Sequence, residues 1–560
     1  MRRIVSFGTG VLFRTLDRQS QGGRRKKRRI AAVGAALAAT LAGTSLAGVP
    51  AASASPGQTV IVTSAGLLNP VAAVLRIGGT VLNQFHLING VEAVIPAILE
   101  PVLAALPGIT VTPDLSVSVQ STTESTGPHT PSDAFLSETG AGLLAAQGDT
   151  GQGTTVAVVD TGIDNLPDFA GRLAGGVDLT GGNAPFQDSY GHGTFVAGLI
   201  AGNGASSDGQ YSGEAPGAQL VSIKVAGASG TTHLSTVILG LQWAVDHRST
   251  YGINVLNLSL GYQSSQSTVT NPLDQAVEGV WNAGITVVAS AGNAGPFNGT
   301  ILSPGDDPMV ITVGALDDMA TPSPVDDEMT NFSSVGPTSV DGWAKPDLVA
   351  SGRSVVSLAA PGSTVYDSNP SARIGAANFV GSGTSFSSAI TSGAAALVLA
   401  ANPGLTPNQV KARLLGTTTP GPVGNPFVDG HGALDAFAAA NAGPMNLNQS
   451  ATGLLGALLG ATIPLSPNGA ADTWNASLWS GVSWNQAPDG GGHWNGWAWS
   501  GADWNGWTWT SRAWNDGGWA GAAWNGEDWS SRAWNDDGWA GSAWNGAAWN
   551  GAAWNSSGWQ

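Results

Sequence analysis

Ser385 lies in a sequence context that could support nucleophilic chemistry. Ser385 lies in the Gly-flanked segment GSGTSFSS, residues 381–388, directly before an Ala-rich stretch that Pro403 and Gly404 end. The pattern predicts a tight turn that leads into a helix. At a helix N-terminus, unpaired backbone N–H groups and the positive end of the dipole suit a developing oxyanion. Serine is also a favoured helix N-cap, so this segment alone leaves a purely structural role open.

Two upstream residues could complete acid–base chemistry with this serine. Asp160 ends the apolar segment TTVAVVD, residues 154–160, which predicts a buried strand of a parallel sheet. Functional groups gather at the carboxyl ends of such strands. His192 lies between Gly191 and Gly193 at the start of an apolar segment that predicts a helix. Together the three residue types can form a hydrolytic triad in which the histidine activates the serine.

Asp160 also begins the sequence DTG, which is found in aspartic proteases. That class needs two such aspartates that share a proton, and here we expect the second to come from a homodimer. An aspartic protease makes no use of His192 and Ser385, so the triad is the preferred interpretation. The other histidines are expected to be structural; they are His86, His129, His233, His247, His431 and His493.

Three motifs together resemble those of a known family. DTGID at 160–164, GHGTFVAG at 191–198 and GTSFSS at 383–388 match, in the same order, the active-site motifs of subtilisin-type serine peptidases. Residues 130–442 are therefore identified as a subtilisin-like catalytic domain, which implies a three-layer α/β fold with a mostly parallel sheet. The resemblance implies that Ser385 attacks the scissile carbonyl, that His192 moves the proton, and that Asp160 orients the imidazole.

The same resemblance implies a substrate site. Asn293, in the segment ITVVASAGNAGP, stands where the family's oxyanion-hole asparagine does. The substrate backbone is expected to bind by strand addition between two edge segments; their residues are Gly227, Ala228, Ser229 and Gly230 on one side, and Ser259, Leu260 and Gly261 on the other. Leu302 occupies a position that is often glycine at the floor of the specificity pocket. A leucine there predicts a preference for small P1 residues.

Two positions depart from the family pattern. Ala389 replaces the proline that usually follows the serine motif, with no loss of a catalytic atom. Asp168 aligns with an aspartate that binds structural calcium, but the loop at 202–213 does not match the other ligands. Calcium needs six to eight oxygen ligands, so we expect Asp168 to be a surface carboxylate and a weak calcium candidate. The chemistry needs no cofactor, and a structural calcium elsewhere stays an open expectation.

The N-terminus has the features of an export signal. The first 29 residues hold ten lysines and arginines against one aspartate, and an apolar run leads to an Ala-x-Ala site at 52–54. This predicts a signal peptide over 1–54, with a membrane anchor as the alternative interpretation. The remainder of the chain is acidic, which argues against nucleic-acid binding. The chain has no cysteine, so no disulfide stabilises the exported protein.

Residues 55–125 form a separate small module. The predicted strands at 59–63 and 80–88 alternate with predicted helices at 70–77 and 96–106. The segment GGTVLNQFHLING, residues 78–90, is similar to the inhibitory prodomain of subtilisin-type proteases. This resemblance implies an α+β, ferredoxin-like module that acts as an intramolecular inhibitor and is cut off near the linker at 121–132.

The C-terminal part has a different composition. A linker at 443–470 precedes a tail at 471–560, which holds nineteen of the chain's 22 tryptophans. From Trp494 they recur every five residues, and the segments 511–526 and 531–546 are nearly identical, so the tail is a repeat array. A coil with five-residue sides and a disordered string both fit this period. Attachment to the cell wall or a polysaccharide is one function, and a spacer or self-association is the other.

These features predict a secreted serine endopeptidase that acts on protein or peptide substrates and is made as a self-processed precursor. Association with the cell wall is a further expectation. The alternative is a cell-surface or adhesion protein whose main activity lies in the tail and whose protease domain serves self-processing.

Overall fold

The computed structural model describes residues 57–66, 68–119 and 130–447, together with short strands between His493 and Asn555. The chain divides into two units, Met1–Pro56 and Gly57–Gln560. The predicted signal peptide, the segment at 120–129 and residues 448–470 of the predicted linker lie outside the described residues.

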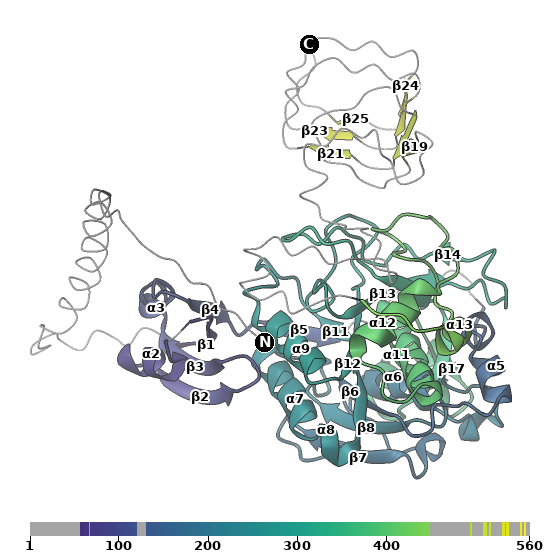
Figure 1. The fold of residues 1–560 in the computed structure, drawn as a ribbon, viewed down its shortest axis with the longest axis horizontal. Helices are drawn as coiled ribbons and strands as arrows, with labels where there is room; N and C mark the ends of the chain where they lie inside the picture. The colour runs from purple at the N-terminus through teal and green to yellow at the C-terminus, as the bar shows by residue number, and fades with distance from the viewer. Residues whose placement is uncertain are drawn as a thin grey trace, which may run out of the picture. The chain divides into compact units, whose positions relative to one another are not determined.

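The N-terminal module is an antiparallel sheet with two helices (Figure 1). Its strand order is β2-β3-β1-β4. The elements are β1 (Gly57–Ser64), α2 (Pro70–Arg76), β2 (Thr80–Phe85), β3 (Gly90–Pro96), η1 (Ala97–Leu99), α3 (Glu100–Ala104) and β4 (Ile109–Pro113). Val60, Val74, Ile95 and Leu103 form part of its buried core. The β-α-β-β-α-β order is that of a ferredoxin-like module. The sequence patterns had indicated only two of its four strands.

The larger part of the described chain is built on an eight-stranded sheet with the order β14-β13-β12-β10-β6-β8-β7, in which β15 also pairs with β13. All pairs are parallel except β13 with β14. The strands are β6 (Thr155–Asp160), β7 (Leu173–Asp178), β8 (Gln219–Lys224), β10 (Ile253–Leu258), β12 (Thr286–Ser290), β13 (Ile311–Asp317), β14 (Glu328–Met329) and β15 (Leu348–Ser351). The predicted strand that ends at Asp160 is therefore central.

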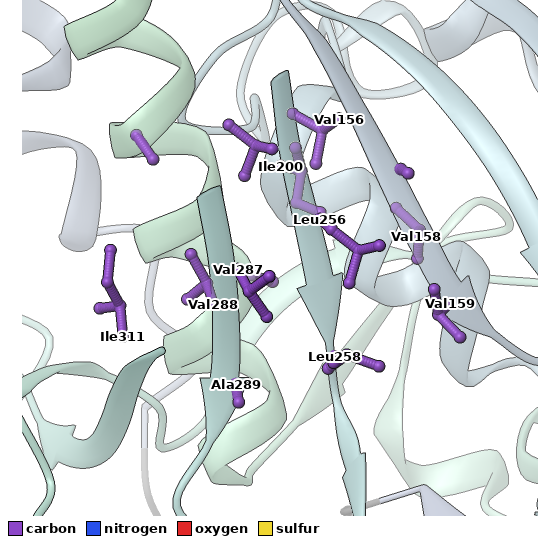
Figure 2. Close-up of a cluster of buried hydrophobic side chains, with 14 of the residues drawn as sticks. Val156, Val158, Val159, Ile200, Leu256, Leu258, Val287, Val288, Ala289 and Ile311 are labelled. Carbon is purple, nitrogen blue, oxygen red and sulfur yellow. The ribbon is translucent and has the colours of Figure 1, made fainter. Parts of the chain in front are cut away.

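Consecutive residues of β6, β10 and β12 are buried, so both faces of the sheet are covered. One helix pair is α6 (His192–Ala201) with α11 (Thr384–Ala401), and the other is α7 (Leu234–Asp246) with α9 (Pro272–Asn282). Figure 2 shows Val156, Leu256 and Val287 from neighbouring strands close to Ile200 of α6. The parallel strands thus position α6 and α11, whose first residues carry the histidine and the serine.

The remaining elements lie around this framework. The helical ones are α4 (Phe135–Glu138), α5 (Ala141–Ala146), η2 (Pro167–Phe169), η3 (Ala205–Ser207), α8 (Arg248–Tyr251), α10 (Thr364–Ser368), η4 (Pro370–Ala372), α12 (Pro407–Gly416) and α13 (Ala436–Asn441). Two small sheets contain β11 (Leu260–Gly261), β5 (Ser116–Val119) and β9 (Thr231–His233), and β16 (Val355–Leu358), β18 (Asn378–Gly381) and β17 (Arg373–Ile374).

Helix α11 is long and apolar enough to cross a membrane, and among the described residues no other helix is. It is also 89% buried inside the catalytic domain, as expected of a core helix. It runs without interruption from Thr384 to Ala401, and Ala389 is fully buried within it.

The described strands of the tail form two parallel ladders. One contains β19 (His493–Trp494), β20 (Thr508–Ser511), β22 (Trp529–Ser531) and β24 (Trp549–Gly551). The other contains β21 (Trp514–Asp516), β23 (Trp534–Asp536) and β25 (Trp554–Asn555). Trp509 pairs with Trp529, which pairs with Trp549. A coil made of four five-residue sides would give this register.

Candidate active site

Asp160 and His192 meet at the end of β6 and the beginning of α6. His192 Nδ1 lies 2.8 Å from Asp160 Oδ1 and 2.9 Å from Oδ2, and both side chains are buried. The backbone N–H of Thr161 donates to Asp160 Oδ1 at 2.7 Å. A carboxylate on Nδ1 favours the tautomer whose Nε2 can accept a proton. His192 Nε2 is buried without a hydrogen-bond partner in the described parts of the chain.

Two glycines permit this close approach. A Cβ atom on Gly193 would lie 2.2 Å from the carbonyl oxygen of Gly162, which is closer than real Cβ contacts. Gly162 itself has φ of 110°, a conformation that side chains disfavour. The glycines of the DTG and GHG motifs therefore let the end of β6 touch the first turn of α6.

Asp188 holds the first turn of α6 and was missed by the sequence reasoning. Its carboxylate accepts hydrogen bonds from the N–H groups of Gly191 at 2.7 Å and Thr194 at 2.8 Å, and from the Thr161 hydroxyl at 2.8 Å. Burial raises the pKa of Asp188, while these hydrogen bonds oppose the shift. The available sequence signal was an aspartate shortly before a helix, where a negative charge is favourable.

Ser385 is the second residue of α11 and is fully buried. Its Oγ lies 3.1 Å from the carbonyl oxygen of Ser259, to which it donates. Ser259 Oγ in turn lies 3.1 Å from the carbonyl oxygen of Ser385 and 2.8 Å from Asn257 Oδ1. The end of β10 is thus bound to the start of α11.

Asn293 follows β12 and lies against the start of α11. Its Oδ1 accepts from the N–H and from the hydroxyl of Thr384, each at 2.9 Å. Its Nδ2 is buried with no hydrogen-bond partner among the described residues. A buried, unpaired amide donor is costly unless a ligand satisfies it. Together with the N-terminus of α11, this donor can stabilise an oxyanion.

The two segments predicted to bind the substrate backbone, 227–230 and 259–261, have strand β5 beside them. Strand β5 of the N-terminal module pairs antiparallel with β11, where Val119 faces Leu260, and with β9, where Ser118 faces Thr231. Strand β9 begins directly after the four predicted residues 227–230, of which Gly230 accepts from Val119 N–H at 3.1 Å. The carbonyl of Ala228 instead accepts from Thr364 Oγ1 at 2.9 Å. Gly227, Ala228 and Ser229 therefore precede the paired edge.

Leu302 packs closely against two glycines, Gly261 at the end of β11 and Gly292 shortly after β12. Its N–H donates to the carbonyl of Ala291 at 3.0 Å. A Cβ atom on Gly292 would lie 2.7 Å from Leu302 Cγ, and one on Gly261 would lie 3.1 Å from Leu302 Cβ. The leucine side chain thus fills space beside the predicted wall at Gly261.

Asp168 is buried, which corrects the expectation of a surface carboxylate. Its carboxylate accepts from the N–H of Ser206 at 3.3 Å and also from the Ser206 hydroxyl. Its backbone carbonyl accepts from Arg172. These protein donors use the oxygens that a calcium ion would need. In the parts of the chain that the structure describes, no group of three or more His, Asp or Glu side chains could hold a metal ion.

The aspartic protease interpretation also needs a correction. A second Asp-Thr-Gly does occur in the chain, at residues 149–151. Asp149 Oδ1 accepts from the N–H of Gly151 at 3.1 Å, which is a local turn interaction. Asp160 instead contacts His192, so no shared-proton pair forms from these two motifs.

Comparison with known proteins agrees with this geometry. The profile of the subtilase family matches residues 151–448. The chain belongs to the subtilase family. Serine protease AprX of Bacillus subtilis is 44% identical over 295 residues, which cover 51% of this chain and 66% of AprX. Subtilisin Savinase of Lederbergia lenta is 36% identical over 293 residues, which cover 52% of this chain and 93% of that protein.

A solved structure supports the fold of this subtilase. Fervidolysin from Fervidobacterium pennivorans, described as a keratinolytic enzyme related to subtilisin, matches with a TM-score of 0.54 and 23% identity. The match covers 71% of this chain and 63% of fervidolysin. At this identity the likeness concerns the fold.

Proposed function

We propose that this subtilase is a serine endopeptidase that uses Asp160, His192 and Ser385. The observation that carries the proposal is the pairing of the buried Asp160 carboxylate with His192 Nδ1 at 2.8 Å, with the unpaired Asn293 Nδ2 near the same helix terminus as Ser385. Ser385 Oγ attacks the peptide carbonyl while His192 Nε2 takes its proton. Asn293 Nδ2 and the Ser385 N–H donate to the oxyanion.

His192 then gives the proton to the leaving amine, and an acyl-enzyme remains on Ser385. A water molecule, deprotonated by His192, attacks the ester and releases the carboxylic acid. Asp160 stays ionised and stabilises the imidazolium throughout.

The N-terminal module is proposed to inhibit the enzyme until it is cut off. Strand β5 lies between β9 and β11, where an extended substrate would add its strand. Asp114 accepts from the N–H and hydroxyl of Ser235, each at 2.9 Å, at the first turn of α7. The cut is expected near the Thr/Ser/Pro-rich linker at 121–132.

The pocket beside Leu302 is proposed to favour small P1 residues, because the leucine fills volume next to Gly261 and Gly292. We further propose export through the basic and apolar N-terminal segment, and a tail that attaches the enzyme to wall or polysaccharide. Loss of retention after truncation at Gly469 would support that attachment.

The decisive experiment compares the secreted wild type with Ser385→Ala by intact mass and N-terminal sequencing. We expect only the wild type to lose the module and to react with a fluorophosphonate. Asn293→Ala, which keeps the nucleophile, should process slowly. Identical processing of wild type and Ser385→Ala would contradict self-processing, and normal peptide hydrolysis by Ser385→Ala would contradict the triad.

A further inference from the structure

Arg172 lies at the centre of three converging backbone carbonyls. Its Nη1 donates to Ala201 at 2.6 Å and to Ala218 at 3.1 Å, and its Nη2 donates to the carbonyl of Asp168. These carbonyls belong to the end of α6, the segment before β8, and η2. Carbonyl dipoles that point at one centre repel each other, so a positive charge at that centre is favourable. The guanidinium supplies that charge beside the Asp168 position.

Two buried lysines make a similar arrangement at a second turn. Lys411 Nζ donates to Pro308 at 2.8 Å and to Val310 at 2.9 Å. Lys345 Nζ donates to the carbonyl of Val310 at 3.0 Å and to Thr312 Oγ1 at 2.8 Å. Both lysine side chains are 1% exposed.

Asp347 is the shared counterion of this lysine pair. It lies 2.7 Å from Lys345 Nζ and 3.2 Å from Lys411 Nζ. Burial raises the pKa of Asp347, but the two lysines more than offset this and hold it below the ordinary value. The turn at 308–312 leads from the Leu302 segment into β13, so the ammonium groups hold the chain where it enters that strand.

Converging carbonyl and carboxylate oxygens are also what a bound calcium ion uses. We infer that the chain's own side-chain cations hold these two turns in place of metal ions: Arg172 beside Asp168, and Lys345 with Lys411 at residues 308–312. Each cation is covalently attached, so chelation cannot remove it. Neither turn should gain stability from calcium.

Thermal unfolding of the full chain with Ser385→Ala, which prevents self-digestion, tests the inference. Arg172→Met should lower Tm by about 5 °C or more in both EDTA and calcium, because three carbonyls lose a charged donor. Arg248→Met is the matched control, since Arg248 is exposed and donates to the Gly284 carbonyl at 3.2 Å. The control should change Tm by under about 1 °C.

Asp168→Asn distinguishes a turn that Arg172 stabilises from a turn that binds a calcium ion. We expect the change in Tm between EDTA and calcium to be the same for Asp168→Asn and for the parent. A calcium-dependent rise that Asp168→Asn abolishes would overturn the inference, as would an Arg172→Met variant as stable as its parent. If Arg172→Met fails to fold, Arg172→Lys provides the test: it should fold and retain part of the stability without calcium, and a requirement for calcium would contradict us.

For the second turn, Lys411→Met should lower Tm equally in EDTA and in calcium, because calcium cannot replace the lost ammonium group beside Lys345. Recovery of Tm when calcium is added to Lys411→Met at millimolar concentration would show that the turn is a metal site.

Discussion

Asn293 Oδ1 accepts hydrogen bonds from both the N–H and the hydroxyl of Thr384, each at 2.9 Å. Because both donors bind the same oxygen, the amide plane is fixed and Nδ2 is left without a partner among the described residues. Thr384 therefore orients the proposed oxyanion donor.

Asn293→Ala should lower kcat by about 10²–10³, the range known for this donor in subtilisin itself, with little change in KM. Thr384→Val, which removes one of the two orienting donors, should lower kcat by about fivefold, since a net hydrogen bond is worth about 1 kcal/mol. Steady-state kinetics on one peptide substrate measures both. Thr384→Ser is the control, and it should remain close to wild type.

Asp114→Ala should weaken inhibition by the N-terminal module. The carboxylate satisfies two donors at the first turn of α7, and a helix-terminal carboxylate contributes about 1 kcal/mol. We expect free activity to appear about fivefold sooner during maturation, measured by peptide hydrolysis after processing. Exposed Asp133 has no such role, so Asp133→Ala should mature on the wild-type schedule. Equal maturation times for the two variants would contradict a role for the Asp114 contact.

Glu214→Gln should abolish the fall in the free energy of unfolding that Glu214 causes between pH 4.5 and 8. Burial against α11 raises the pKa of Glu214 to about 8. As pH rises from 4.5 to 8, the unfolded chain releases this proton while the folded chain retains it. The free energy of unfolding therefore falls over this window and then levels off. The raised pKa of Glu214 implies a fall on the order of a few kcal/mol.

Denaturant unfolding of the Ser385→Ala protein at several pH values measures this effect. The Glu214→Gln variant should show a flatter profile between pH 4.5 and 8, and exposed Glu328→Gln should leave the profile as it is. A profile for Glu214→Gln that is parallel to the parent's would mean that other groups cause the loss.

Leu302→Gly should open the pocket beside Gly261 and Gly292. We expect kcat/KM for a Phe P1 substrate to rise by about 10–100-fold, because a side chain that blocks a pocket costs a few kcal/mol. The same kinetics on an Ala P1 substrate is the internal control and should change little. A wild-type enzyme that already prefers Phe would contradict the role of Leu302.

Local motifs allowed the contact between Asp160 and His192 to be predicted, because its geometry depends on adjacent glycines. The environment of Asp168 could not be predicted in the same way. Its partner Ser206 lies 38 residues away, and Arg172 reaches carbonyls in other elements. Likewise, the edge that pairs with β5 begins at Gly230 and not at Gly227, because β5 comes from another module whose pairing the local sequence does not reveal.

The pairing of the tail strands affects how far the tail sequence extends in space. Trp509, Trp529 and Trp549 occupy successive rungs of one ladder, so forty residues of sequence advance two strand spacings. Two spacings are about 10 Å, whereas an extended chain of that length would reach roughly 130 Å. Along this ladder, additional sequence therefore adds little to the distance that the strands span. Each further rung, twenty residues later in the sequence, would instead add one more tryptophan in register with Trp509, Trp529 and Trp549.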